Sequence, residues 1–144
     1  MIALGCDHGG YQLKEFIKKH LENKGIECKD YGTYSEESVD YPVYAQKVCE
    51  AIQKGECDKG ILCCGTGIGI SISANKFKGI RCALLRESFS ARLTKEHNNA
   101  NVIALGGRVT GTELAADIVD TWLDAKFAGG RHQNRIDIIS SFEK

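Results

Sequence analysis

Short apolar runs alternate with longer amphipathic segments along the whole chain. Five runs are typical of β-strands and fall at residues 2–6, 26–31, 60–64, 82–85 and 102–105. Most of them are continuously apolar rather than alternating, which is typical of parallel strands covered on both faces. Because each run is followed by a segment with helical spacing, the pattern predicts the α/β class. We expect a single-domain three-layer α/β/α sandwich with a five-stranded parallel Rossmann-like sheet.

Residues that favour helix ends bound the amphipathic segments. A first helix is predicted from apolar residues spaced between positions 13 and 21, with Gly25 as its stop. Asp40 and Pro42 suit the cap and first turn of a second helix, which ends near Gly55. The run at 26–31 is less apolar than the others, so we place it near a sheet edge. Further helices are predicted at 68–75, 88–97 and 114–123, with a helical tail near 131–143.

Length and charge narrow the function classes. A chain of 144 residues fits one domain, residues 1–144, with 42% hydrophobic and 26% charged residues. Nineteen basic residues balance nineteen acidic ones, so no basic excess is available for nucleic acid. No apolar run reaches the ~18 residues of a membrane span, and the first residues lack a signal-peptide pattern. We expect a cytoplasmic protein that binds neither nucleic acid nor membrane.

Seven cysteines are spread along the chain without the spacing of a metal site. No C-x-x-C or H-x-x-x-H pair occurs, and Cys63 and Cys64 are adjacent. Structural zinc sites need repeated short ligand spacings because four ligands converge on one ion. The pattern favours a reducing cytosol in which most of these thiols serve as small hydrophobic side chains. We therefore expect no metal and no cofactor.

Two glycine-rich loops follow strands one and three, at residues 6–10 and 64–69. In open parallel sheets, ligands bind beyond the carboxyl ends of strands where neighbouring crossovers diverge. If strands one and three flank such a point, the two loops converge there. Glycines allow close approach of the backbone, and free N–H groups at a helix start favour an anion. The sequence predicts a binding site for a small anionic ligand between these loops.

Neither loop matches a nucleotide-binding signature. For a dinucleotide fingerprint that begins at Gly65 and Gly67, the third glycine would fall at Ile70, and the loop also lacks the lysine of a P-loop. Asp30 nevertheless ends the second strand, where a Rossmann domain carries its ribose-binding acid. A nucleotide-binding module therefore stays open as an alternative.

Cys64 is the single residue most suggestive of chemistry. It ends a strand and leads directly into a helix start, where partial positive charge stabilises a thiolate. A thiolate there could act as a nucleophile or as a general base, and the alternative is a buried structural thiol. Because side chains alternate along a strand, Cys63 should point to the opposite face, into packing.

Histidines and one aspartate add candidate acid–base groups. Asp7 and His8 are neighbours in the first loop, although Asp7 could simply cap the next helix. His97 ends a predicted helix, where it is a catalytic candidate or a cationic helix cap. His20 lies on an apolar helical stripe and His132 in a polar tail, so structural roles are favoured for both.

Arginines supply candidate phosphate ligands. Arg131 and Arg135 are four residues apart and share one face if the tail is helical. Two guanidiniums together suit a phosphate dianion, although a solvated basic surface is the usual reading of such a tail. Arg108 is a third candidate. Together the residues indicate acid–base chemistry on a small phosphorylated molecule.

Six segments in order resemble ribose-5-phosphate isomerase type B, whose wider family includes galactose-6-phosphate and allose-6-phosphate isomerases. The resemblance covers essentially the whole chain. It is carried by Gly5-Cys6-Asp7-His8-Gly9-Gly10, Ser38-Val39-Asp40-Tyr41-Pro42, Cys64-Gly65-Thr66-Gly67-Ile68-Gly69-Ile70-Ser71, Ala74-Asn75-Lys76, Glu96-His97-Asn98 and Gly129-Gly130-Arg131-His132.

The resemblance implies a metal-independent aldose–ketose isomerase that interconverts ribose 5-phosphate and ribulose 5-phosphate through a cis-enediolate. Cys64 matches the general base that removes the C2 proton; another branch of the family uses a glutamate near the position of Ile72. Residues Gly65, Gly67, Ile68 and Gly69 match an anion hole for the enediolate oxygens.

The resemblance also assigns the surrounding residues. Thr66 matches a hydroxyl that helps to move protons between substrate oxygens, and Asp7 and His97 match residues implicated in opening the furanose ring. His97 is expected from the partner subunit of a homodimer or a dimer of dimers with shared sites. The remaining matches contact sugar or phosphate: Tyr41, Asn98, His8, Arg131, Arg135 and, from the partner, Arg108.

The sequence alone does not determine whether the substrate is a pentose or a hexose phosphate, or whether the protein turns it over. One hydroxymethylene is worth only ~1–3 kcal/mol in an accommodating pocket, so a hexose 6-phosphate is an alternative substrate. A non-catalytic sugar-phosphate-binding module is a further alternative. It would bind the ligand without turning it over.

Overall fold

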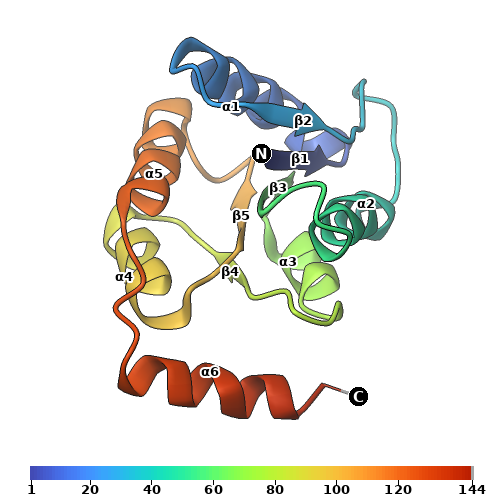
Figure 1. The fold of residues 1–144 in the computed structure, drawn as a ribbon. Helices are drawn as coiled ribbons and strands as arrows, with labels where there is room; N and C mark the ends of the chain where they lie inside the picture. The colour runs from blue at the N-terminus through green and yellow to red at the C-terminus, as the bar shows by residue number, and fades with distance from the viewer. Residues whose placement is uncertain (144) are drawn as a thin grey trace.

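The computed structural model describes residues 1–143 as one five-stranded sheet between two layers of helices (Figure 1). The strands pair in the order β2-β1-β3-β5-β4, and every pair is parallel. The α/β sandwich and the five parallel strands are as predicted. The strands are β1 (Ile2–Cys6), β2 (Cys28–Asp30), β3 (Lys59–Cys64), β4 (Cys82–Leu84) and β5 (Val102–Gly106).

The helices cover both faces of the sheet. Helices α1, α4 and α5 contribute to the core on one face, and α2 and α3 contribute to the core on the other. Helix α6 lies apart from both layers and packs mainly against α4 (Figure 1). The helices are α1 (Tyr11–Asn23), α2 (Tyr41–Gln53), α3 (Ile68–Ala74), α4 (Ser88–Asn98), α5 (Thr112–Asp124) and α6 (Arg131–Ser141).

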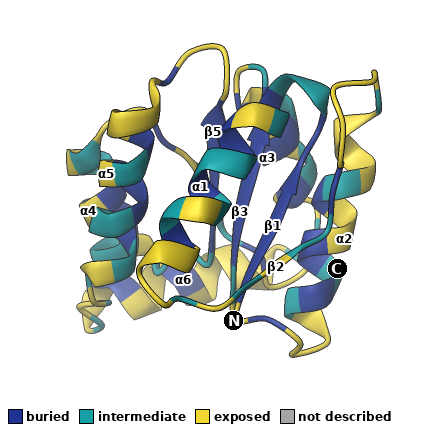
Figure 2. Ribbon diagram, turned by 90° about the horizontal axis from the view of Figure 1, so that it is seen from above, coloured by how far each residue is buried: buried dark blue, intermediate teal, exposed yellow. Residues whose placement is uncertain are grey.

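Each central strand is buried on both of its faces, as its continuous apolar sequence predicted (Figure 2). Side chains alternate between the two cores, so Ile61 and Cys63 of β3 contact the core under α1 and α5. Leu62 and Cys64 contact the opposite core, under α2 and α3. The prediction that adjacent Cys63 and Cys64 point to opposite faces is therefore confirmed.

The structure differs from the predicted elements mainly at the edges of the sheet. The second strand is confined to residues 28–30, because its flanks turn into loops at the edge position predicted for it. A short 3-10 helix, η1 (His8–Gly10), precedes α1 and was not predicted. Asp40 stands at the N-cap of α2, but its side chain makes no capping hydrogen bond.

Helix α6 lies at the amino ends of the strands. Helix α4 begins after the carboxyl end of β4 and runs back, so its last residues come just before β5 starts. The backbone N–H of Ala128 donates to Glu96 O (3.0 Å), which ties the segment before α6 to the end of α4. In Figure 2 the mostly exposed α6 lies towards the end of the sheet at which β1 starts, and Figure 1 shows that it lies well away from β1 itself.

Candidate active site

The two glycine-rich loops meet at the carboxyl ends of β1 and β3, which are neighbours in the sheet. Cys6 pairs with Cys63 at the end of this ladder, and Asp7 N–H donates to Cys63 O (3.2 Å). The chain leaves β1 through α1 on one face and leaves β3 through α3 on the other. This divergence creates the predicted switch point, where a crevice suits a ligand.

Glycines allow the two loops to touch. A Cβ added at Gly10 would lie 2.3 Å from the carbonyl carbon of Cys63, and one at Gly9 would lie 3.0 Å from Gly65 N. Real Cβ atoms do not approach backbone as closely as the first of these distances requires. The first loop therefore needs glycine so that its backbone can pack against the second loop and the end of β3.

Cys64 is held at the bottom of the second loop. Its side chain is 4% exposed, and its Sγ accepts a hydrogen bond from Gly67 N–H (3.1 Å). Gly67 reaches this position with φ +80°, a left-handed conformation that glycine adopts without strain. A backbone N–H directed at sulfur stabilises a thiolate, so the geometry suits a base.

The neighbouring thiols of Cys63 and Cys6 have raised pKa values. Burial, followed by the nearby Cys6, raises the pKa of Cys63 well above its ordinary value. Burial likewise raises the pKa of Cys6 to about 12, against the opposing effect of Lys14. Both thiols are therefore neutral at physiological pH and act as packing side chains.

Backbone N–H groups of the second loop remain available for an anion. Among residues 1–143, no acceptor is bonded to the N–H groups of Gly65, Thr66 and Gly69. The exposed Thr66 hydroxyl accepts from Ile68 N–H (3.2 Å), which fixes its oxygen above the loop. These donors lie in the same short turn as Cys64, as required for an oxyanion site beside a base.

Asp7 and His8 enter the site from the first loop. Asp7 accepts from Gly10 N–H (3.1 Å) and caps η1, so the capping role considered from the sequence is present. Nδ1 of His8 lies 3.2 Å from the backbone N–H of Val39, which donates to it. Since Nδ1 is the acceptor, the neutral ring carries its proton on Nε2. That N–H can donate to a phosphate oxygen.

Tyr41 and Arg108 line the same crevice. A Cβ at Gly69 would lie 2.9 Å from the Tyr41 hydroxyl oxygen, so the phenol packs directly on the second loop. A Cβ at Gly65 would lie 3.0 Å from Nη1 of Arg108. Arg108 therefore stands beside the loops of its own chain, whereas the resemblance assigned it to the partner's site.

The remaining predicted site residues, His97, Asn98, Arg131 and Arg135, are not brought to this crevice. They lie at the end of α4 and the start of α6, at the amino edge of the sheet. A five-residue strand is roughly 17 Å long, so no hydrogen bond joins the two groups within one chain.

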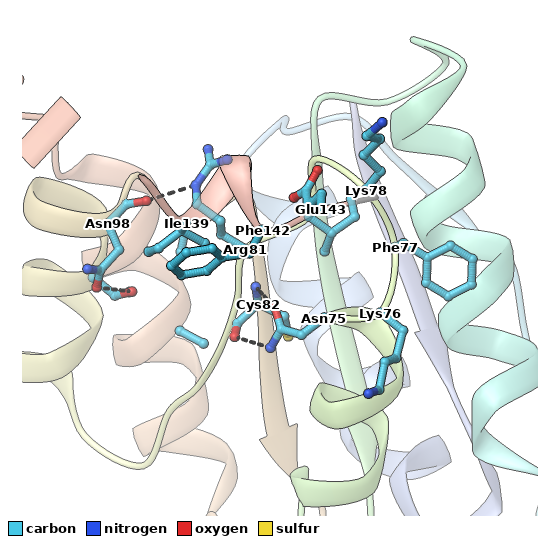
Figure 3. Close-up of a pocket in the computed structure, with 14 residues that line it drawn as sticks. Asn75, Lys76, Phe77, Lys78, Arg81, Cys82, Asn98, Ile139, Phe142 and Glu143 are labelled. Carbon is cyan, nitrogen blue, oxygen red and sulfur yellow. Dashed lines mark hydrogen bonds between the residues drawn. The ribbon is translucent and has the colours of Figure 1, made fainter. Parts of the chain in front are cut away.

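A cavity of about 660 Å³ opens at this amino edge, between α6 and the α3–β4 connection (Figure 3). Ile139 of α6 and Phe142, just after that helix, form one wall, and Lys76 and Lys78 come from the connection opposite. Among the predicted site residues, Asn98 alone lines this cavity. The cavity is thus separate from the crevice that holds Cys64.

Asp30 is not free to bind a ribose. Both of its carboxylate oxygens accept from Lys14 Nζ (2.9 and 2.8 Å), and one also accepts from Gly32 N–H (2.9 Å). The nucleotide-binding alternative depended on this carboxylate, which the ion pair with Lys14 already occupies. Local sequence does not reveal this pair, because Lys14 lies in a helix whose lysines are expected to face solvent.

His132 makes a structural contact, in line with the structural role expected for it. Its ring stacks on that of the catalytic candidate His97, with centroids 4.2 Å apart and planes inclined by 10°. Its burial within α6 follows the spacing to Ile136, the other buried residue of that helix. This i, i+4 spacing was the available signal.

Among residues 1–143, no group of three or more His, Cys, Asp or Glu side chains is arranged to hold a metal ion. Over the same residues, every helix is too short or too polar to cross a bilayer. All seven cysteines are free thiols.

A thiol next to unpaired backbone N–H groups, at the switch point of a parallel sheet, defines an α/β domain built for proton transfer on an anionic ligand. The chain belongs to the Ribose/Galactose Isomerase family, which it matches over residues 2–139. It is 54% identical over 143 residues to ribose-5-phosphate isomerase B of Escherichia coli, covering 99% of this chain and 96% of that protein.

Solved structures agree with this family assignment. A ribose-5-phosphate isomerase B of Clostridium thermocellum has 56% sequence identity and a TM-score of 0.98, covering 99% of this chain and 96% of that one. A ribose 5-phosphate isomerase of Thermotoga maritima has 55% identity and a TM-score of 0.96, covering 97% of each chain.

Proposed function

We propose that this protein is an aldose–ketose isomerase that interconverts D-ribose 5-phosphate and D-ribulose 5-phosphate through a cis-enediolate. The observation that carries the proposal is the placement of the Cys64 sulfur within one turn of the unpaired N–H groups of the second loop. A base and an oxyanion site in that relation are what proton abstraction next to a carbonyl requires.

In the proposed reaction, the Cys64 thiolate removes the C2 proton of the open-chain aldose. Electrons from the C–H bond form the C1–C2 double bond, and the carbonyl oxygen becomes an enediolate oxygen that the loop N–H groups stabilise. The proton then returns to C1 to give the ketose, while Thr66 relays a proton between the two oxygens. The loop donors supply charge stabilisation, so the mechanism uses no metal and no cofactor.

The remaining side chains bind and prepare the substrate. Asp7 and His97 open the furanose ring, and Tyr41 and Asn98 contact the sugar. His8, Arg131, Arg135 and Arg108 hold the phosphate, whose remote binding energy places C2 against the base.

The site is completed by a second copy of the chain, in a homodimer or in a dimer of dimers. The separation of His97 and both tail arginines from Cys64 within one chain supports this assembly. Apolar side chains exposed near both groups also support it, namely Ile68, Ile72, Leu84, Ile138, Ile139 and Phe142. A two-fold contact would cover them and bring His97 of one subunit to Cys64 of the other.

The free thiols support a cytoplasmic location.

The adjacent cysteines provide the test. Cys64→Ala is expected to lower kcat for ribose 5-phosphate by roughly 10²–10⁴-fold, the usual contribution of a general base. Cys63→Ala, one residue away on the opposite face of β3, is the matched control and should retain activity within a small factor. Both variants are assayed with a chelator present, after circular dichroism has verified their folding.

The same assay is run on allose 6-phosphate and galactose 6-phosphate. Preference for a hexose phosphate would keep Cys64 as the base but overturn the pentose assignment. A folded wild-type protein that turns over none of the three substrates would overturn the enzymatic proposal.

A further inference from the structure

The first turn of α6 places His132 directly on the last turn of α4. Its imidazole stacks on that of His97, with ring centroids 4.2 Å apart and planes inclined by 10°. His132 is buried, whereas its neighbours Arg131 and Gln133 are exposed. The contact is thus specific to one side chain of the turn.

Backbone contacts fix this arrangement. Ala128 N–H donates to Glu96 O (3.0 Å), so the segment before α6 is attached one residue from His97. Gly129 and Gly130 follow with φ of +67° and +57°, which turns the chain sharply into α6. His132 N–H then donates to Gly129 O (3.1 Å). The connection directs the His132 ring onto α4.

The charges around the stack keep His132 neutral. Burial lowers the pKa of His132, and so do the positive charges of His97, Arg131 and Arg135. The nearest charged groups of α4 are engaged elsewhere, with Glu96 on Arg92 (3.1 Å) and the Lys95 ammonium over the Trp122 ring (5.1 Å). Within residues 1–143, no carboxylate forms an ion pair with either imidazole. Burial and the neighbouring positive charges thus disfavour protonation of His132.

We propose that His132 is a positioning residue of the shared active site, a neutral flat ring that holds the His97 imidazole while His97 gains and loses a proton. The inference rests on the proposed function, in which His97 opens the furanose. Opening moves the proton of the anomeric hydroxyl to the ring oxygen as the bond between C1 and that oxygen breaks. Neutral His97 accepts the first proton and returns it to the ring oxygen, and its plane must stay fixed during both transfers.

Two replacements of similar size separate stacking from simple packing. His132→Phe keeps a flat neutral ring and is expected to retain kcat for ribose 5-phosphate within about threefold. His132→Leu fills space without stacking and is expected to lower kcat by at least about tenfold, as the loss of an oriented acid–base group does. His20→Leu is the control and should leave kcat unchanged, because His20 lies on α1 and pairs with Asp120 of α5.

The KM distinguishes positioning of His97 from general damage to α6. Arg131 and Arg135 lie in the same turn as His132 and hold the phosphate in the proposed function. If His132 positions His97, KM stays within about twofold in His132→Leu while kcat falls. A rise in KM with kcat preserved, or equal losses in the Phe and Leu variants, would overturn the inference in favour of a packing role.

Titration of the imidazoles by NMR tests the stack without activity. In the wild type, the pKa of His132 should lie below the ordinary value of a histidine. In His97→Phe, the pKa of His132 should rise, because a neighbouring positive charge is removed. An unchanged His132 titration would contradict the inference. If the wild-type protein lacked isomerase activity but showed the coupled titration, the proposed function would fail instead.

Discussion

Lys14 shows how one buried side chain can join a helix, a strand and a loop. Its side chain is 1% exposed, and Nζ donates to both oxygens of Asp30 and to Thr33 O (2.7 Å). Asp30 is itself nearly buried. The pair fixes the loop after β2, which runs on to Val39 and its hydrogen bond to His8. A contact remote from the crevice thus supports His8, the proposed phosphate ligand.

Replacing Lys14 by methionine should destabilise the protein markedly. The Asp30 carboxylate would remain buried without its main counter-charge, a change that costs about 3–5 kcal/mol in comparable pairs. Urea unfolding measures the loss in free energy of unfolding. Lys18→Met is the control, since Lys18 reaches Asp30 only at 3.5 Å from a partly exposed position, and it should cost less than about 1 kcal/mol. Equal costs for the two variants would refute the assigned role of Lys14.

Stability should also depend on pH through Lys14. Burial opposes its charged form, but the hydrogen bond and attraction to Asp30 outweigh burial, so the pKa of Lys14 is raised. A raised lysine pKa stabilises the fold fully below the unfolded value of about 10.4, and the stabilisation is lost as pH rises through the folded value. Unfolding free energies measured from pH 9 to 12 should therefore fall more steeply for the wild type than for Lys14→Met. Parallel curves would show that another group causes the fall.

At the scale of elements, the turn from β3 into α3 requires glycine both for its backbone conformation and for the space around it. Gly67 and Gly79 both have φ +80°, but a Cβ at Gly67 would lie 2.7 Å from Leu84 Cδ1 and 2.9 Å from Leu105 C. A Cβ at Gly79 would meet no atom within 4 Å. Alanine at either position would therefore have the same unfavourable backbone conformation, but only alanine at Gly67 would also collide with neighbouring atoms.

Gly67→Ala is expected to reduce kcat by about 10²-fold or more, because the backbone must shift and move the N–H that contacts Cys64. Gly79→Ala should keep full activity. Its free energy of unfolding should fall by only about 1–2 kcal/mol, the cost of holding alanine in the left-handed conformation. Steady-state kinetics and thermal unfolding of the two variants make the comparison. If Gly67→Ala retained wild-type kcat, the loop would not be an oxyanion site.

Local sequence determined the buried elements and the crevice much better than the contacts between distant segments. The central strands β1, β3 and β5 could be predicted because burial on both faces requires continuous apolar residues. The loops at Asp7 and Cys64 could be predicted because ligand chemistry and glycine coincide at strand ends. The pair of Lys14 with Asp30 joins residues sixteen apart whose individual polarity indicates exposure.

The tail shows the other limit of local sequence. His132 lies among polar residues, and its burial depends on how the connection from α5 returns to α4. Arg108 similarly follows β5, and its place beside Gly65 is set by the neighbouring position of β3 and β5 in the sheet. Such placements follow from strand order, which local periodicity does not determine.

At the scale of the whole molecule, the polarity of a parallel sheet separates the two halves of the proposed site. Every strand carries its carboxyl end to the edge that holds Cys64, and α4 necessarily returns to the other edge with His97. One chain therefore presents a base and an oxyanion site at one edge, and imidazoles and arginines at the opposite edge. An isologous dimer joins unlike edges twice and creates two equivalent sites.

Mixing two inactive variants tests this arrangement. Cys64→Ala and His97→Ala should each lose most activity as homodimers, because every site lacks one group. In a hybrid dimer, one site combines intact Cys64 with intact His97 of the partner subunit, and the other lacks both. Hybrids isolated through two different affinity tags should thus regain about half of the wild-type kcat per dimer, as expected for one of two independent sites. Hybrids as inactive as the parent variants would show that both groups must come from the same chain, and the shared site would be abandoned.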